Sequence, residues 1–121
     1  MSRRNRAFTV LEVLIVVTIT GIILAIAVPT FFRARERARL RSCQENLHKL
    51  DGAKNEWALE TGADSAAEPT WEELIGPTGY IRRAVACPGG GEYTLGNMRT
   101  TPSCSLSNQN PYPHTYEIDP N

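Results

Sequence analysis

Phe8-Thr9-Val10-Leu11-Glu12-Val13 opens an apolar run that extends to Phe32, and Glu12 is the only charged residue in it. Between residues 13 and 28 every side chain is Val, Leu, Ile or Ala except Thr18, Thr20 and Gly21. An apolar run without a polar face predicts a helix surrounded by lipid or by copies of itself. Because a helix needs about 20 apolar residues to cross the hydrocarbon core of a membrane, the predicted span covers residues 8–32.

Glu12 lies inside this predicted span. A carboxylate in the membrane costs about 3 kcal/mol on insertion scales, and it is by default a functional residue with a partner. Its nearest candidate partner is a positive charge created by cleavage of the chain.

The residues around Glu12 match a known pattern. Three arginines precede the small residue Ala7, and Phe-Thr, two apolar residues and Glu follow, then the apolar helix with Pro29 near its end. This segment resembles the N-terminus of type IV prepilins and type II secretion pseudopilins. Ala7 stands where that family usually has glycine.

The resemblance implies a processing event and an assembly role. A prepilin peptidase of the inner membrane is expected to cleave between Ala7 and Phe8 and to methylate the new N-terminus at Phe8. Glu12 corresponds to the glutamate of the family, and Pro29 to its helix-bending proline. Residues 1–7 are then a leader peptide that stays on the cytoplasmic side.

Two other interpretations of the N-terminal segment compete with this one. Residues 13–24 resemble the hydrophobic region of a secretory signal peptide, and Ala25-Ile26-Ala27 has the spacing of its cleavage site. Glu12 beside the hydrophobic region argues against that interpretation, as does a helical pattern that continues through the cleavage site. The second alternative is an uncleaved, single-span membrane anchor.

Charge is distributed unevenly along the chain. The totals balance at 13 basic and 13 acidic residues, but residues 33–41 hold five arginines against one acid. Residues 42–121 hold 5 basic and 11 acidic residues, a net of −6. The basic segment follows the apolar run directly, where anionic headgroups attract each cation by about 1 kcal/mol. We therefore interpret it as a solvated helix face, and nucleic acid is an unlikely partner.

Beyond the arginines, apolar residues recur at steps of three and four, which predicts one face of a continuing amphipathic helix. The apolar face consists of Leu40, Cys43, Leu47, Leu50, Ala53 and Trp57. The predicted polar face consists of Gln44, Glu45, Asn46, Lys49, Asp51, Lys54 and Glu56. The helix of the head is expected to cover residues 33–61 and to end at Thr61-Gly62, because glycine suits the left-handed cap.

Residues 62–121 are expected to form a small cover over the apolar face. A short helix is predicted at residues 69–75 with Thr70 as its N-cap. Residues 80–86 and 92–95 are β-like and are separated by a turn at residues 87–91, which predicts a hairpin. Another strand is expected at residues 114–118. The predicted fold class is α+β: a long N-terminal helix packed by a small antiparallel sheet with long loops.

This C-terminal region extends the resemblance. Residues 42–60, Gly76-Pro77 with Tyr80-Ile81, and residues 87–96 resemble a bacterial pilin-like subgroup with small heads. The resemblance therefore covers most of the chain, although its C-terminal part identifies a subgroup and not a function.

The three cysteines allow several arrangements. In the cell envelope, a disulfide between Cys87 and Cys104 would close a loop worth about 3 kcal/mol. Cys43 on the apolar face is interpreted as a buried small hydrophobe. Pairs that include Cys43, and three free thiols, remain alternatives.

No metal site and no cofactor are expected from the sequence. The cysteine spacing fits neither a CxxC motif nor a zinc knuckle, and only His48 and His114 are available as further ligands. Calcium binding by Glu117 and Asp119 is disfavoured, because two acids in a loop-rich tail are more often simply solvated.

No catalytic constellation is present in the sequence. We therefore predict a structural subunit, not an enzyme, that assembles with copies of itself and other pilins on an inner-membrane platform. The precursor is expected in the inner membrane and the filament at the cell surface or in the periplasm. The kind of filament stays open: a pilus, a secretion pseudopilus or a DNA-uptake pilus with an Arg82, Arg83 and Arg99 patch. The alternative is a monomeric, membrane-anchored or secreted binding protein.

Overall fold

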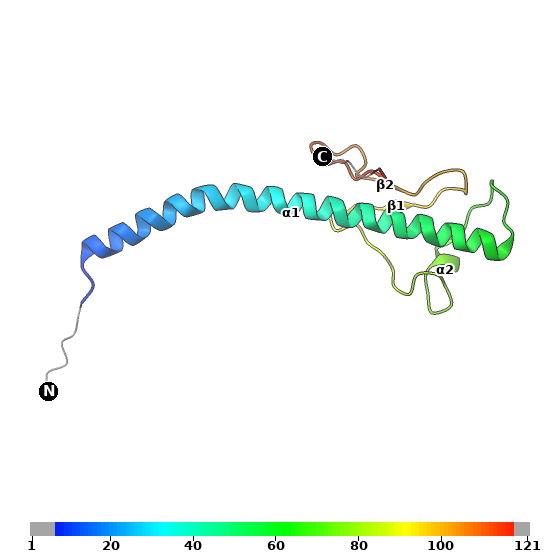
Figure 1. Ribbon diagram of the computed structural model, residues 1–121, viewed down its shortest axis with the longest axis horizontal. Helices are drawn as coiled ribbons and strands as arrows, with labels where there is room; N and C mark the ends of the chain where they lie inside the picture. Colours follow the sequence, from blue (N-terminus) through cyan, green and yellow to red (C-terminus); the bar gives the residue numbers. More distant parts are fainter. Residues whose placement is uncertain (1–6, 118–121) are drawn as a thin grey trace, which may run out of the picture. The chain divides into compact units, whose positions relative to one another are not determined.

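The computed structural model describes residues 7–117 and confirms the α+β class. Helix α1 spans Val10–Thr61, and the short helix α2 spans Trp71–Leu74. Strands β1, Tyr93–Thr94, and β2, Ser103–Cys104, form one small antiparallel sheet (Figure 1). The chain divides into two compact units between Arg35 and Glu36, and α1 contributes to both. The leader arginines, Ile118 and Asp119 lie outside the described residues.

The N-terminal unit is the apolar half of α1. Its large apolar side chains are exposed, from Val28 at 46 % to Val10 at 77 %. By length and composition this helix is suited to span a membrane. The helix continues through Pro29. Whether Pro29 bends the assembled helix stays a prediction.

Three threonines in this half bond to their own helix. The hydroxyls of Thr18, Thr20 and Thr30 donate to the carbonyls four residues earlier, at 2.7, 2.7 and 3.0 Å. An unpaired hydroxyl in an apolar medium costs several kcal/mol. These bonds therefore make the polar side chains of the span compatible with lipid or with a packed helix bundle.

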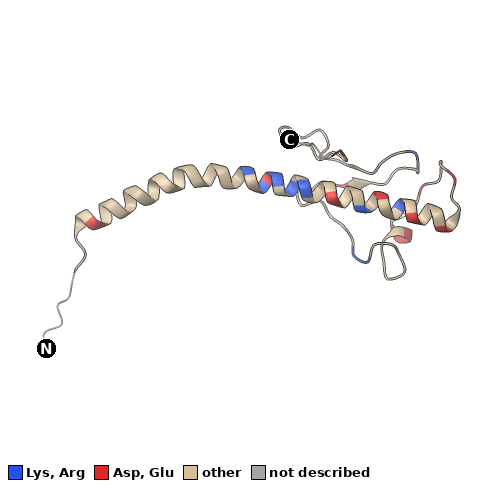
Figure 2. Cartoon of the chain, in the orientation of Figure 1, with Lys and Arg blue, Asp and Glu red and all other residues tan. Residues whose placement is uncertain are grey.

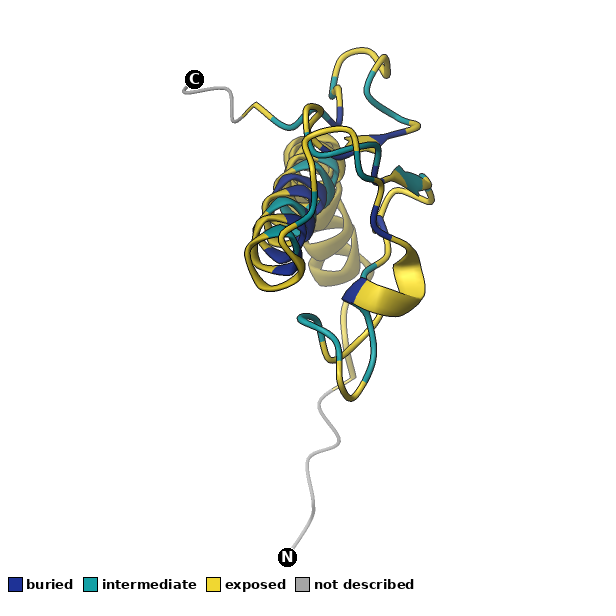
Figure 3. Cartoon of the chain, turned by 90° about the vertical axis from the view of Figure 1, so that its right-hand side faces the viewer, coloured by how far each residue is buried: buried dark blue, intermediate teal, exposed yellow. Residues whose placement is uncertain are grey.

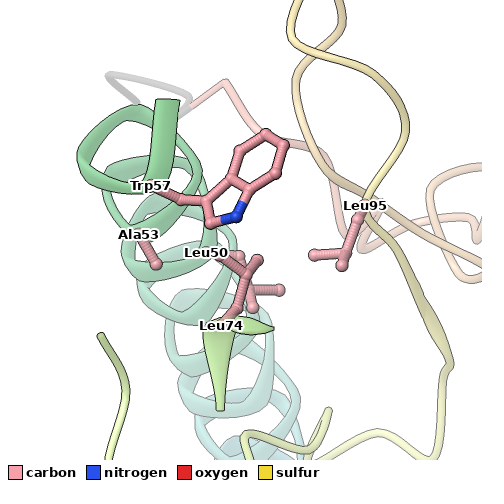
Figure 4. Packing of buried hydrophobic residues seen from close by; sticks show 5 residues of the cluster. All are labelled: Leu50, Ala53, Trp57, Leu74 and Leu95. Atoms are coloured by element: carbon pink, nitrogen blue, oxygen red, sulfur yellow. The ribbon is translucent and has the colours of Figure 1, made fainter. Parts of the chain in front are cut away.

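The C-terminal unit buries the predicted apolar face of α1. Leu50, Ala53 and Trp57 of α1 pack against Leu74 of α2 and against Leu95, as Figure 4 shows. The dark blue stripe of buried residues in Figure 3 runs along the side of α1 that faces the loops. The amphipathic prediction for this half is confirmed for its apolar face.

The predicted polar face is wrong at Gln44 and Lys54. Gln44 is 5 % exposed, and its side-chain amide donates to the carbonyl of Glu117 at 2.9 Å. Lys54 is only 1 % exposed. Both side chains are long enough to reach past the helix edge and bond to loop backbone, which helical periodicity does not reveal.

Lys54 organises the loop that follows β1. Its ammonium group donates to three backbone carbonyls: Leu95 at 2.7 Å, Asn97 at 2.9 Å and Thr100 at 2.7 Å. Burial lowers the pKa of Lys54 below its usual value, and the nearby charge of Asp51 opposes this shift. A buried cation needs such partners, because an unpaired one is strongly destabilising.

Both helix-boundary predictions are confirmed. Helix α1 ends at Thr61, and Gly62 follows with a φ of 65° in the left-handed region. Thr70 is the N-cap of α2 and forms a capping box with Glu73: the Thr70 N–H donates to the Glu73 carboxylate at 2.8 Å. The bond from the Thr70 backbone, followed by that from its hydroxyl, lowers the pKa of Glu73.

The strand predictions are only partly right. Strand β1 pairs with β2, with Tyr93 opposite Cys104 and Thr94 opposite Ser103, and not with residues 80–86. Ile81 instead forms an isolated parallel bridge with Ile75. Residues 114–117 form no strand, and the N–H of His114 bonds to the carbonyl of Leu106 at 3.1 Å. The glycine-rich turn at 87–91 folds against His114 and Leu106, which separates residues 80–86 from β1.

Candidate functional site

The N-terminal candidate site begins just before α1. Ala7 and Phe8 lie in an exposed, non-helical segment, and Phe8 is 88 % exposed. Phe8 and Glu12 line one shallow groove together with Val13 and Val16. The structure thus places Phe8 and Glu12 on one side of the helix start.

Glu12 also closes a capping box that our sequence analysis missed. The Thr9 N–H and hydroxyl donate to Glu12 Oε2 at 3.0 and 3.3 Å. In return the Glu12 N–H donates to the Thr9 hydroxyl at 3.2 Å. The signal was present as Thr-x-x-Glu directly before an apolar run. Glu12 is therefore held at the helix N-terminus, where the backbone N–H groups favour a negative charge.

The arginine-rich segment follows the uncharged stretch of α1 (Figure 2). Arg39 forms an ion pair with Glu36, with 2.8 Å between Nη1 and Oε1. Both side chains are about one third exposed, so the pair contributes at most about 1 kcal/mol. This geometry agrees with a solvated basic face.

A second cluster lies in the head and was not anticipated. Cys43 of α1, Cys87, Cys104 of β2 and His114 are all buried, and their ligand atoms lie within 4.8 Å of one another. Cys87 Sγ is 3.2 Å from His114 Nδ1. Within residues 7–117, which include all three cysteines, the thiols are free. The sequence analysis paired Cys87 with Cys104, kept pairs that include Cys43 as alternatives, and did not place His114 beside them.

The turn after Cys87 shapes this cluster. The backbone N–H groups of Gly91 and Gly89 favour the thiolate form of Cys87 and lower its pKa, and the N–H group of Leu106 acts in the same direction on Cys104. A Cβ atom on Gly91 would lie 2.6 Å from Cys104 Sγ. The glycines therefore allow the backbone to approach the sulfur atoms closely.

The surroundings shift the pKa values of the cluster in different directions. Burial raises the pKa of Cys43 to about 12, although a hydrogen bond with Tyr93 opposes this. Burial also acts to raise the pKa of Cys87, but the glycine N–H groups bring it below its ordinary value. Burial lowers the pKa of His114, against the charge of Glu36.

Comparison with known proteins identifies the family. Residues 2–28 match the family described as the prokaryotic N-terminal methylation motif. The type II secretion system core protein G of Dickeya chrysanthemi is 31 % identical, over 78 % of this chain and 70 % of that protein. The chain belongs to the family of type IV prepilins and type II secretion pseudopilins.

Other members of the family are also similar. Core protein G of Escherichia coli strain K12 is 29 % identical over 78 % of this chain and 73 % of that protein. The type IV major pilin protein PilA of Myxococcus xanthus is 40 % identical, over 47 % of this chain and 26 % of that protein. No solved structure gave a significant match.

The family motif covers only one of the two candidate sites. Ala7, Phe8 and Glu12 lie inside it, and Pro29 follows its last residue directly. The cysteine and histidine cluster lies entirely outside it. The head of this pseudopilin-family chain therefore requires its own explanation.

Proposed function

We propose that this chain is a structural subunit of a type IV pilus or a type II secretion pseudopilus. The observation that carries the proposal is the start of α1, where a capped Glu12 and an exposed Phe8 begin a helix half whose apolar side chains are left exposed by residues 7–117. Membership of a pilin family supports a structural role and gives no support to a catalytic role.

Processing creates the partner for Glu12. Prepilin peptidase cleaves between Ala7 and Phe8, which frees the α-amino group of Phe8, and then methylates this nitrogen. A peptidase needs an accessible, extended substrate, and the exposed, non-helical segment before α1 supplies one. The methylated amine keeps its positive charge.

Before assembly, residues 8–32 anchor the precursor in the inner membrane as a single span. The threonine hydroxyls bond within the helix, so Glu12 is the main polar group that the span carries. Its bonds to Thr9 reduce the cost of desolvation but do not neutralise its charge.

During assembly, Glu12 pairs with the Phe8 amine of a neighbouring subunit. An unpaired charge in an apolar medium is costly, so only a neighbour at the correct axial step satisfies Glu12. The pair therefore sets the register of the growing filament. Pro29 lacks an N–H and bends the helix, which adjusts the packing of the apolar halves.

The remaining partners follow from this assembly. Copies of the chain and other pilins form the helical filament on an inner-membrane platform, and the acidic heads face outward at the cell surface or in the periplasm. The net charge of −6 over residues 42–121 disfavours nucleic acid, because duplex binding depends on neutralising phosphates.

Mass spectrometry of the mature N-terminus tests this function. A methylated Phe8 is the expected result. A chain that begins at Val28 would instead identify a secreted protein with a signal peptide. An intact leader in cells that contain active prepilin peptidase would identify a plain membrane anchor. Either of the last two results overturns the proposal.

A further inference from the structure

The head contains a complete set of ligands for one tetrahedral metal ion. Three sulfur atoms and one imidazole nitrogen lie within 4.8 Å of one another. A tetrahedral zinc ion with Zn–S bonds of about 2.3 Å requires its ligand atoms to be about 3.8 Å apart. We propose that Cys43, Cys87, Cys104 and His114 bind one structural zinc ion.

The chemistry of the ligands selects the metal. Thiolate and imidazole ligands suit zinc, whereas calcium and magnesium require oxygen ligands. Four protein ligands fill a tetrahedron and leave no open position, which is typical of a structural and not a catalytic zinc site. The ion neutralises most of the charge of three thiolates, so their burial becomes favourable.

Burial argues against a chance encounter of polar side chains. All four residues are at most 6 % exposed. Leu47 of α1 packs in the same cluster, and Tyr93, Leu106 and Tyr116 surround it. His114 Nδ1 lies 3.2 Å from Cys87 Sγ, about 0.3 Å less than the roughly 3.5 Å between a nitrogen and a sulfur ligand on one tetrahedral zinc ion.

The backbone around the sulfur atoms is arranged as in a metal site. Groups outside the first ring of ligands commonly tune a metal site, and here backbone N–H groups favour the thiolate forms of Cys87 and Cys104. A Cβ on Gly91 would collide with Cys104 Sγ, and one on Gly89 would lie 2.8 Å from His114 Cε1. The Cys-Pro-Gly-Gly-Gly turn thus provides both a ligand and the space for two others.

A zinc ion also explains how so small a head is held together. Each strand has only two residues, and the four ligands come from α1, the turn at 87–91, β2 and the C-terminal loop. When a metal site forms only in the folded chain, the free energy of metal binding stabilises the folded state. A disulfide between Cys87 and Cys104, our expectation from the sequence, accounts for two of the four side chains, whereas zinc accounts for all of them.

The test uses the full chain in detergent, purified under reducing conditions without chelators. Elemental analysis and non-denaturing mass spectrometry should find one zinc ion per chain. After the zinc is exchanged for Co²⁺, the protein should show the thiolate-to-cobalt charge-transfer absorption and the intense d–d bands of tetrahedral coordination.

Variants assign the ligands. Cys87→Ser and His114→Ala should lose stoichiometric zinc, whereas His114→Cys should retain it because a thiolate replaces the imidazole. His48→Asn, which alters the exposed histidine of the same region, should bind zinc as the wild type does. Zinc that persists in both Cys87→Ser and His114→Ala would overturn the assignment.

The wild-type chain alone can also refute the proposal, so the test does not depend on variants that fold. A chain without zinc that gives no thiolate-to-cobalt absorption when Co²⁺ is added contradicts it. So does a chain isolated from the cell envelope, without added reductant, that is two hydrogens lighter and contains a disulfide between Cys87 and Cys104.

Discussion

The two halves of α1 differ in where their contacts are made. In the N-terminal half, Ile26 is 69 % exposed, whereas Leu47 and Leu50 in the C-terminal half are 0 % exposed. The apolar side chains of the C-terminal half pack within the chain, against the loops, α2 and the small sheet. The N-terminal half needs lipid or other subunits. One continuous helix thus contains an exposed apolar segment, which we propose serves assembly, and a segment that packs within its own head. Substitutions should distinguish these two roles.

The largest expected effect is on assembly, from Glu12→Gln. Glutamine keeps the capping box, because its amide oxygen accepts from Thr9, but it removes the charge that we propose pairs with the Phe8 amine. Filaments counted by electron microscopy should be lost, while the precursor still inserts into the membrane and its head still folds.

Thr9→Ala is the matched control for that variant. It removes the cap hydroxyl that bonds to Glu12 but keeps the carboxylate. Loss of a cap costs about 1 kcal/mol, so filaments should be fewer but still present. If Thr9→Ala abolished filaments and Glu12→Gln did not, capping and not charge would be the role of Glu12.

The second largest effect should come from metal removal, and it should be confined to the head. A chelator should lower the thermal unfolding midpoint of the head, because zinc binding contributes to its folding. The fluorescence of Trp57 and Trp71, which both lie in the head, monitors this transition. The helical circular dichroism signal of the apolar half in detergent should not change when the chelator is added. Added zinc should restore the midpoint, whereas an unchanged midpoint in the metal-depleted chain would contradict a structural ion.

A smaller effect is expected from Lys54→Met. Three backbone carbonyls lose their donor, and unsatisfied buried groups cost about 1–3 kcal/mol each. The free energy of unfolding in urea should therefore fall by about 3 kcal/mol. Lys49→Met, on the exposed side of the same helix, should change it by less than about 0.5 kcal/mol.

The smallest effect concerns the capping box of α2. The lowered pKa of Glu73 means that its carboxylate stabilises the fold above the pKa of an unfolded glutamate. This contribution should disappear as the pH falls through the lower, folded pKa. Thr70→Ala should weaken the acid dependence of head stability in urea titrations, because it removes the cap hydroxyl. An unchanged acid dependence would show that the capping box does not set it.

Features determined by nearby residues could be predicted from the sequence. The end of α1 at Thr61 follows from Gly62, and the cap at Thr70 follows from its own side chain and Glu73. The apolar face from Cys43 to Trp57 follows from helical periodicity. Each of these depends on residues within a few positions of one another.

Features determined by distant residues could not be predicted. Lys54 was assigned to the polar face, but its ammonium group is buried where it donates to backbone carbonyls more than forty positions away in the sequence. Strand β1 was assigned to the wrong partner, because the turn at 87–91 folds toward His114 and not into a hairpin. The cysteine and histidine cluster draws on four separate segments, so its spacing in the sequence resembles no compact metal motif.

Zero-length crosslinking of purified filaments tests the central claim most directly. A carbodiimide joins a carboxylate to an amine only where the two are in contact. We predict dimers and longer ladders whose crosslinked peptides join Glu12 of one chain to the methylated Phe8 of another. A link confined to Phe8 and Glu12 of the same chain, or filaments in which Glu12 forms no link, would contradict assembly through this pair.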